Sequence, residues 1–111
     1  LGLKDGQVTI SVQKLPPEML SKLYAGSDLT VNISDAEGFG LATLESLSCE
    51  TPIIINMTGG LQEQITDGEN EFGVPVYPSS KAIIGSQPIP WIYEDRVNGD
   101  DVVDAMEKIR I

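Results

Sequence analysis

The residues of this sequence whose types and spacing could do chemistry are two carboxylates, Glu37 and Glu45, and the two glycines between them. Gly38 and Gly40 flank one aromatic residue, and a helical pattern of leucines begins at Leu41. A glycine turn at a helix start offers an anion free backbone N–H groups and the positive end of the helix dipole. Glu45 lies one helical turn beyond Leu41, about 6 Å along the axis. A diphosphate held at this turn would therefore have a carboxylate at about the reach of a ribose diol.

The elements that must position this turn are visible on both sides of it. Leu29–Ile33 is an apolar run that predicts a buried strand, and the leucines predict a helix from Leu41 to about Ser48. Ile53–Ile55 follows Pro52 as a continuous apolar run, which fits a strand buried on both faces. Spacing alone fits an ordinary strand-to-helix loop as well as a ligand site.

Two further strands and two further helices complete this pattern. Val8–Val12 is rich in β-branched residues and predicts a strand, and Gly73–Tyr77 predicts a weaker one, which Pro75 places at a sheet edge. A helix is predicted over residues 17–25, and a short one leads from Gly59 and Gly60 through Ile65. Both glycines are also explained by a tight turn without any ligand.

Strands that alternate with helices imply parallel pairing through right-handed crossovers. The predicted fold class is α/β, a three-layer Rossmann-like half-domain with about four mostly parallel strands. Ligands on such sheets bind beyond the carboxyl ends of the strands, where the Ser34–Leu41 and Thr58–Gly60 turns are expected.

We expect residues 1–111 to form a single domain whose core is residues 1–78. Residues 79–97 are rich in proline without a clear period and predict an irregular covering segment. Residues 98–111 predict a C-terminal helix that Asp100 or Asp101 caps. Its predicted apolar stripe consists of Val102, Val103, Met106 and Ile109.

The composition narrows the classes of function. The net charge is -10, with 7 basic and 17 acidic residues, which argues against nucleic acid and against anionic membrane surfaces as partners. The sequence has no histidine, which excludes a histidine acid, base or metal ligand, and the single Cys49 excludes an internal disulfide. No apolar run is long enough to span a membrane. We expect a cytoplasmic protein, with the cytoplasmic face of a membrane as the alternative location of the full protein. Because residue 1 is Leu, we expect the chain to begin inside a longer protein.

Four ordered blocks across residues 8–78 resemble one enzyme family. The motif Glu37-x7-Glu45 with Gly-Phe-Gly after its first residue resembles the GT-B fold, group 1 glycosyltransferases, which are retaining and metal-independent. The other three blocks that resemble this family are Leu23–Leu29, Thr51–Ile55 and Gly59–Glu63. The resemblance implies part of the C-terminal, nucleotide-sugar-binding domain of such an enzyme.

The resemblance also implies a reaction and the residues that perform it. A sugar would pass from a nucleotide-sugar to a hydroxyl of an acceptor sugar or lipid, with retention and without a metal or other cofactor. Glu37 would bind the donor sugar and stabilise charge at the reacting centre, and Glu45 would bind the ribose. The donor phosphates would lie at Gly38, Phe39, Gly40 and Leu41. The base would lie at Gln13, Lys14 and Leu15, and the donor loop would be Gly59 and Gly60.

Two other interpretations stay open. One is another GT-B enzyme, such as a nucleotide-sugar epimerase, and the other is a non-catalytic scaffold module that keeps the fold without the chemistry. Both would preserve the strand–turn–helix pattern.

The sequence departs from the family in three ways. Glu50 stands where the family usually has glycine, which costs on the order of 1 kcal/mol if the backbone there is left-handed. The family's Arg/Lys pair for the diphosphate and its N-terminal domain are absent, so the chain alone should be inactive. Two strands that normally separate Val8–Val12 from Leu29–Ile33 are also absent. The first strand must then pair directly with the second, pair with another chain in a self-association, or leave an edge exposed.

Overall fold

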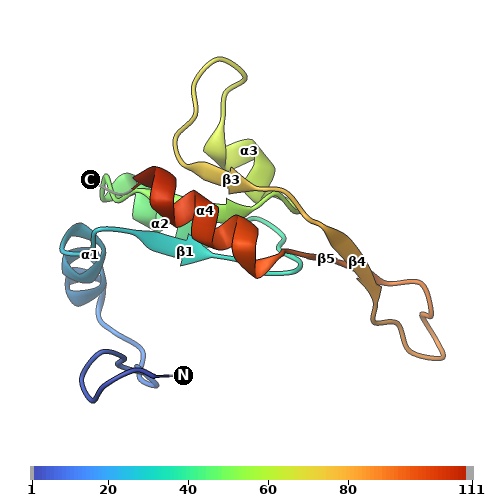
Figure 1. The fold of residues 1–111 in the computed structure, drawn as a ribbon, viewed down its shortest axis with the longest axis horizontal. Helices are drawn as coiled ribbons and strands as arrows, with labels where there is room; N and C mark the ends of the chain where they lie inside the picture. The colour runs from blue at the N-terminus through green and yellow to red at the C-terminus, as the bar shows by residue number, and fades with distance from the viewer. Residues whose placement is uncertain (1, 110–111) are drawn as a thin grey trace.

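The structure, a computed structural model, describes residues 2–109, which fold into an α/β arrangement (Figure 1). Residues 110 and 111, the end of the predicted C-terminal segment, lie outside the described residues. The elements in chain order are α1 (Pro17–Ala25), β1 (Thr30–Asn32), α2 (Leu41–Ser48), β2 (Ile53–Asn56), α3 (Leu61–Ile65), β3 (Val74–Val76), β4 (Ser80–Ile83), β5 (Tyr93–Arg96) and α4 (Gly99–Ile109).

A three-stranded parallel sheet forms the centre of the molecule, in the order β1-β2-β3. Thr30 is in register with Ile53, and Ile54 with Val74. β2 is the middle strand, and all four of its residues are buried. The predicted Rossmann-like α/β class is therefore confirmed, as are the central strand buried on both faces and the edge position of β3.

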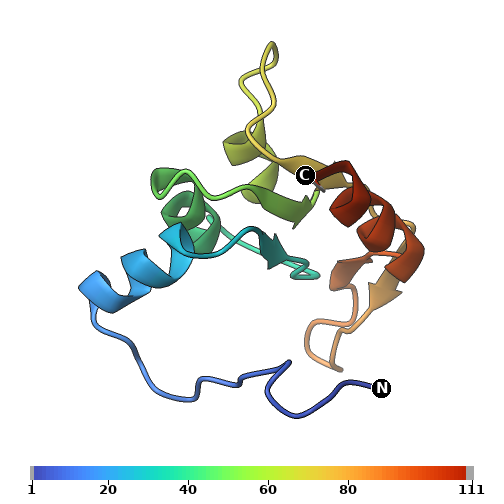
Figure 2. The ribbon, with the colours of Figure 1, turned by 60° about the vertical axis from the view of Figure 1, so that its left-hand side comes forward.

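The side chains of β2 alternate between two small cores, because successive residues of a strand point to opposite faces. Ile53 and Ile55 pack with Leu61 and Ile65 of α3 on one face. Ile54 packs on the other face in a cluster completed by Val76, Val102 and Ala105. Figures 1 and 2 show the result: α4 covers one face of the sheet, and α2 and α3 lie on the other.

The last helix differs from its prediction in its cap and in its stripe. Asn98, rather than Asp100 or Asp101, caps α4, since its side chain accepts from the Asp100 amide at 2.8 Å. Val102 and Ala105 are buried and Ile109 packs beside them. Val103 and Met106 are exposed, so the predicted stripe was wrong at these two positions.

Residues 79–97, predicted as an irregular covering segment, contain two strands at their ends. β4 and β5 pair antiparallel, with Ser80 opposite Arg96 and Ile83 opposite Tyr93. The prolines that suggested irregular structure, Pro88 and Pro90, lie in the connection between the two strands, where no ladder hydrogen bond is required of them. The pairing is long-range, so a local period could not show it.

The predicted strand at Val8–Val12 is also wrong. These residues belong to no strand, and Val8, Ile10 and Val12 are 59%, 81% and 90% exposed. β1 pairs only with β2 within residues 2–109, so of the three alternatives for Val8–Val12 the direct pairing with the second strand does not occur. A strand needs a partner for its backbone groups, and none of the described residues supplies one here.

None of the helices within residues 2–109 combines the length and apolar character required to cross a membrane.

Candidate functional site

Two glycine-bearing turns interlock at the carboxyl ends of β1 and β2. The Gly60 amide donates to the Gly38 carbonyl at 2.9 Å and to the Glu37 carbonyl at 3.4 Å. A Cβ atom at Gly59 would lie 1.9 Å from the Glu37 carbonyl oxygen, and one at Gly60 would lie 2.1 Å from that of Gly38. Glycine is therefore required at both positions by backbone packing alone, and this packing fixes the two predicted turns against each other.

Gly40 ends the first turn in the left-handed conformation, with φ of 83°, and α2 begins at the next residue. The amides of residues 39–42 donate to no acceptor within the described chain, as expected for the open end of a helix. The Phe39 carbonyl accepts from the side chain of Gln64, which anchors the turn to α3. The predicted phosphate-binding residues thus lie together, with their N–H groups available.

Glu37 and Glu45 lie on either side of this helix start. Glu37 is half-buried, and its Cγ lies 3.3 Å from the position that a Cβ of Gly40 would take. Glu45 is on α2, one turn beyond Leu41, as the sequence predicted. Glu37 therefore lies beside Gly40, and Glu45 lies one helical turn from the start of α2.

Tyr24 of α1 donates a hydrogen bond to Glu45 Oε2 at 3.2 Å. Burial raises the pKa of the Tyr24 hydroxyl, and the Glu45 carboxylate raises this pKa further. A hollow of about 290 Å³ lies between the two helices and reaches both Leu41 and Glu45. Its other lining residues are Pro17, Leu20, Ser21, Tyr24, Leu44, Ser48 and Cys49. The hollow is mainly apolar, which suits a flat or aliphatic part of a ligand.

A polar network that sequence reasoning missed ties β5 to the same end of the sheet. Asn56 Nδ2 donates to the carbonyls of Ser34 and Asp95 at 3.0 and 3.1 Å. Thr58 Oγ1 donates to Asp95 Oδ2 at 2.8 Å. The one available signal was that Asn56 and Thr58 directly follow a predicted strand, where polar residues of parallel sheets gather at the site.

The same network contains the guanidinium of Arg96. Arg96 pairs with Asp35 at 2.5 Å and with Glu94 at 2.8 Å. Its guanidinium is therefore committed to two carboxylates. It does not replace the free Arg/Lys pair that the resemblance implies for a diphosphate.

The predicted base-binding residues are not brought to the turn. No hydrogen bond or ion pair within residues 2–109 connects Gln13, Lys14 or Leu15 with Glu37 to Glu45. Gln13 and Leu15 line a separate hollow of about 350 Å³ formed with residues 9–12.

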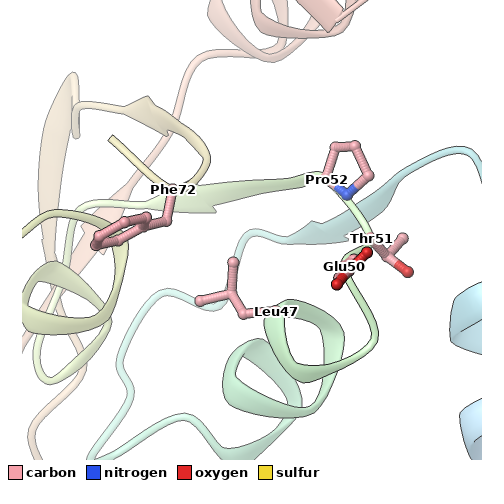
Figure 3. Close-up of a pocket in the computed structure, with 5 residues that line it drawn as sticks. All are labelled: Leu47, Glu50, Thr51, Pro52 and Phe72. Carbon is pink, nitrogen blue, oxygen red and sulfur yellow. The ribbon is translucent and has the colours of Figure 1, made fainter. Parts of the chain in front are cut away.

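Another hollow, of about 380 Å³, lies at the opposite end of the sheet. Figure 3 shows Leu47 and Phe72 in it, with Glu50, Thr51 and Pro52 on the connection between α2 and β2. These residues precede β2 and β3, whereas ligands of parallel sheets bind after the strands. Size alone therefore does not identify the site, and the interlocked turns remain the candidate.

Comparison with known proteins agrees with this geometry. The model of the family described as "Glycosyl transferases group 1" matches residues 2–107. The chain belongs to this family. The match spans every element that builds the candidate site, and it includes the β4–β5 hairpin.

Curated members of the family resemble part of the chain. A D-inositol 3-phosphate glycosyltransferase of Acidothermus cellulolyticus is 37% identical over 70 residues, which are 63% of this chain and 15% of the relative. The protein of the same name from Streptosporangium roseum is 40% identical over 68 residues, which are 61% of this chain and 15% of the relative. A glycosyltransferase of Methanocaldococcus jannaschii is 38% identical over 63 residues, which are 57% of this chain and 16% of the relative. The matched part is thus about one sixth of the length of these relatives.

Proposed function

We propose that this chain is the donor-binding part of a GT-B glycosyltransferase, which transfers a sugar from a nucleotide-sugar to an acceptor hydroxyl. One observation carries the proposal: the interlocked glycine turns leave the amides of residues 39–42 free at the start of α2, between two carboxylates. Membership of the group 1 family supports glycosyl transfer in general.

Each group at the turn has a role in this proposal. The amides of Phe39, Gly40 and Leu41 bind phosphate oxygens and stabilise the leaving diphosphate as it gains charge. Glu45 accepts hydrogen bonds from the ribose, and Tyr24 holds its carboxylate. Glu37 binds hydroxyls of the donor sugar close to the reacting carbon. The reaction proceeds with retention and needs no metal, because amides and the helix dipole supply the charge stabilisation.

Nuclear magnetic resonance tests this function on the chain itself, because it detects weak binding. A titration with ribonucleoside diphosphates should shift the amide signals of residues 39–42 and of Glu45. Glu45→Ala should weaken binding by about 1–3 kcal/mol, the loss expected for hydrogen bonds to a charged group. Glu69→Ala, an exposed glutamate in the turn before β3, is the matched control and should bind as the unmodified chain does.

A 2′,3′-dideoxy ribose sharpens this test. The unmodified chain should prefer the ribonucleotide, and Glu45→Ala should lose that preference. Shifts confined to the hollow of Figure 3, or none at all, would reject donor binding at the turn and favour a scaffold role.

A further inference from the structure

The β4–β5 hairpin ends in a segment that carries no charge. Residues 83–93, here called the arm tip, contain no Asp, Glu, Lys or Arg in a chain where such residues make up 22%. Six large apolar or aromatic side chains of the arm tip are between 40% and 71% exposed: Ile83, Ile84, Ile89, Trp91, Ile92 and Tyr93. Figure 1 shows the arm extending away from the sheet and its helices.

The exposed apolar side chains occupy both faces of the arm. Ile83 and Tyr93 are directly opposite each other and point to one face. Ile84 and Ile92 are the next residues on each strand and point to the other face, where the Ile84 amide donates to the Ile92 carbonyl at 2.9 Å. The paired part of the arm tip therefore exposes apolar side chains on both faces, and Ser86 and Gln87 lie in the turn at its end.

The backbone of the arm tip is only partly paired within the described residues. The Ser86 and Ile89 amides each donate to the other residue's carbonyl at 3.0 Å, and the Ile84 amide is also paired. Pro88 and Pro90 have no N–H group. Four other amides donate to no acceptor within residues 2–109, those of Gly85, Gln87, Trp91 and Ile92. They require water or headgroup oxygens, so the arm tip suits a hydrated interface and not the hydrocarbon interior.

The segment Val8–Val12 shows why two-sided exposure matters. Its exposed apolar residues, Val8, Ile10 and Val12, alternate with Thr9 and Ser11. In an extended segment this alternation makes one face apolar and the other polar, which fits a strand that packs against a partner on one side. In the arm tip, by contrast, the Ile83–Tyr93 face and the Ile84–Ile92 face are both apolar. A medium that surrounds it on all sides matches it better than a flat partner surface does.

We propose that the arm tip inserts into the interface of a lipid bilayer with zwitterionic headgroups. Trp and Tyr prefer the boundary between headgroups and acyl chains, and the isoleucines add apolar area. A net charge of -10 repels anionic lipids, so the partner is a neutral surface such as phosphatidylcholine. The contact is shallow and reversible.

The base of the arm connects this contact with the candidate site. Asp95 and Arg96 of β5 contact Thr58 and Asp35 at the carboxyl ends of the parallel strands. An inserted arm therefore holds the turn near the membrane surface. This step rests on the proposed function: it makes the acceptor a hydroxyl borne by a lipid.

Trp91 is the single tryptophan of the chain and reports directly on the arm tip. Phosphatidylcholine vesicles added to the 111-residue chain should shift its emission to shorter wavelength, and lipids brominated in their acyl chains should quench it. Ile89→Asp should lower the vesicle-bound fraction about tenfold or more, since it replaces an apolar anchor with a charge.

Val103→Asp is the matched control. Val103 is 55% exposed on α4, close to the 60% of Ile89, and the substitution adds the same charge. The control should bind vesicles as the unmodified chain does, with unfolding curves showing that both variants fold. Unchanged Trp91 emission with vesicles, or equal loss in both variants, would overturn the proposal.

Association of the chain through the arm would also overturn it. In that case gel filtration would show an oligomer that Ile89→Asp dissociates, while vesicles would leave the emission unaltered. Vesicle binding does not require a nucleotide, so the two proposals can fail separately. Vesicle binding can be absent while the turn still binds nucleotide, and nucleotide binding can be absent while the arm tip still binds vesicles.

Discussion

At the scale of single residues, Glu50 carries backbone strain that the sequence already suggested. Its φ is 58°, and it is the one non-glycine residue among residues 2–109 with a positive φ. The left-handed conformation brings the Cβ of an L-residue too close to the following carbonyl. Its carboxylate makes no hydrogen bond or ion pair within the described chain that could offset this cost.

Glu50→Gly should therefore stabilise the fold by about 1 kcal/mol, measured as the free energy of unfolding in urea. Glu63→Gly is the opposite control. Glu63 lies in α3, where glycine costs about 1 kcal/mol relative to a good helix former, so that variant should be less stable. A loss of stability in Glu50→Gly would show that its side chain makes a favourable contact that outweighs the strain.

Gly38 and Gly40 look equivalent in the sequence, but the structure separates them. Gly40 has a φ of 83°, and its Cβ would lie 2.3 Å from Cδ2 of the fully buried Leu61. At Gly38 a Cβ would meet nothing within 4 Å. Gly40→Ala should lower the free energy of unfolding by about 2 kcal/mol, whereas Gly38→Ala should change it by less than about 0.5 kcal/mol.

Thermal or urea unfolding of the two alanine variants decides this. If Gly40→Ala is as stable as Gly38→Ala, then Leu61 can move aside and the turn tolerates a side chain. Gly38 directly precedes the free amides and Gly40 carries one of them, so the pair also separates stability from ligand approach: Gly38→Ala should reduce nucleotide binding while the fold is preserved.

At the scale of elements, local signals predicted what local interactions build. The leucine period of α2 and the continuous apolar run of β2 are short-range patterns, and both elements occur where predicted. Val8–Val12 has strand composition but no partner, and composition cannot supply one. The arm was missed because its strands are defined by pairing with each other.

The candidate site divides in the same way. The turn and the start of α2 follow from glycines and leucines that are adjacent in sequence. The contact of Arg96 with Asp35 joins residues 61 positions apart, and Thr58 and Asp95 are 37 apart. Such contacts depend on the assembled sheet, so no spacing rule could have indicated them.

Asn56 connects three elements and gives a test of this network. Its side chain is fully buried and donates to two carbonyls, that of Ser34 after β1 and that of Asp95 in β5. Asn56→Ala leaves both carbonyls without their donor and should cost about 2 kcal/mol of unfolding free energy. Amide exchange of β4 and β5 should also become faster, because the arm loses an anchor.

Asn70→Ala is the control for this prediction. Asn70 Nδ2 donates to Asp67 in an exposed turn, so its loss should cost less than about 0.5 kcal/mol. Equal stability of the two variants would mean that water or neighbouring donors satisfy the carbonyls around Asn56, and that the contacts of Asp95 and Arg96 with Thr58 and Asp35 suffice to hold the arm.

At the scale of the whole molecule, the charge distribution limits what the chain can bind. The turn offers backbone amides, but Arg96 is engaged by Asp35 and Glu94. With a net charge of -10, the surrounding field opposes a dianionic ligand. The helix dipole contributes only about 0.3–2 kcal/mol, and the charge-assisted contacts of a free Arg or Lys are missing.

We therefore expect the 111-residue chain to bind nucleoside diphosphates with a dissociation constant of about 1 mM or weaker, which corresponds to about 4 kcal/mol. Isothermal titration calorimetry with millimolar ligand measures this constant, and raising the salt concentration should strengthen the binding, because the repulsion is screened. In the proposed function this chain supplies one wall of a two-domain site, so the isolated chain should transfer no sugar. A micromolar dissociation constant would mean that the chain holds its own cation for the diphosphate. Arg96 would then have to leave Asp35 and Glu94, and Arg96→Met would abolish that affinity.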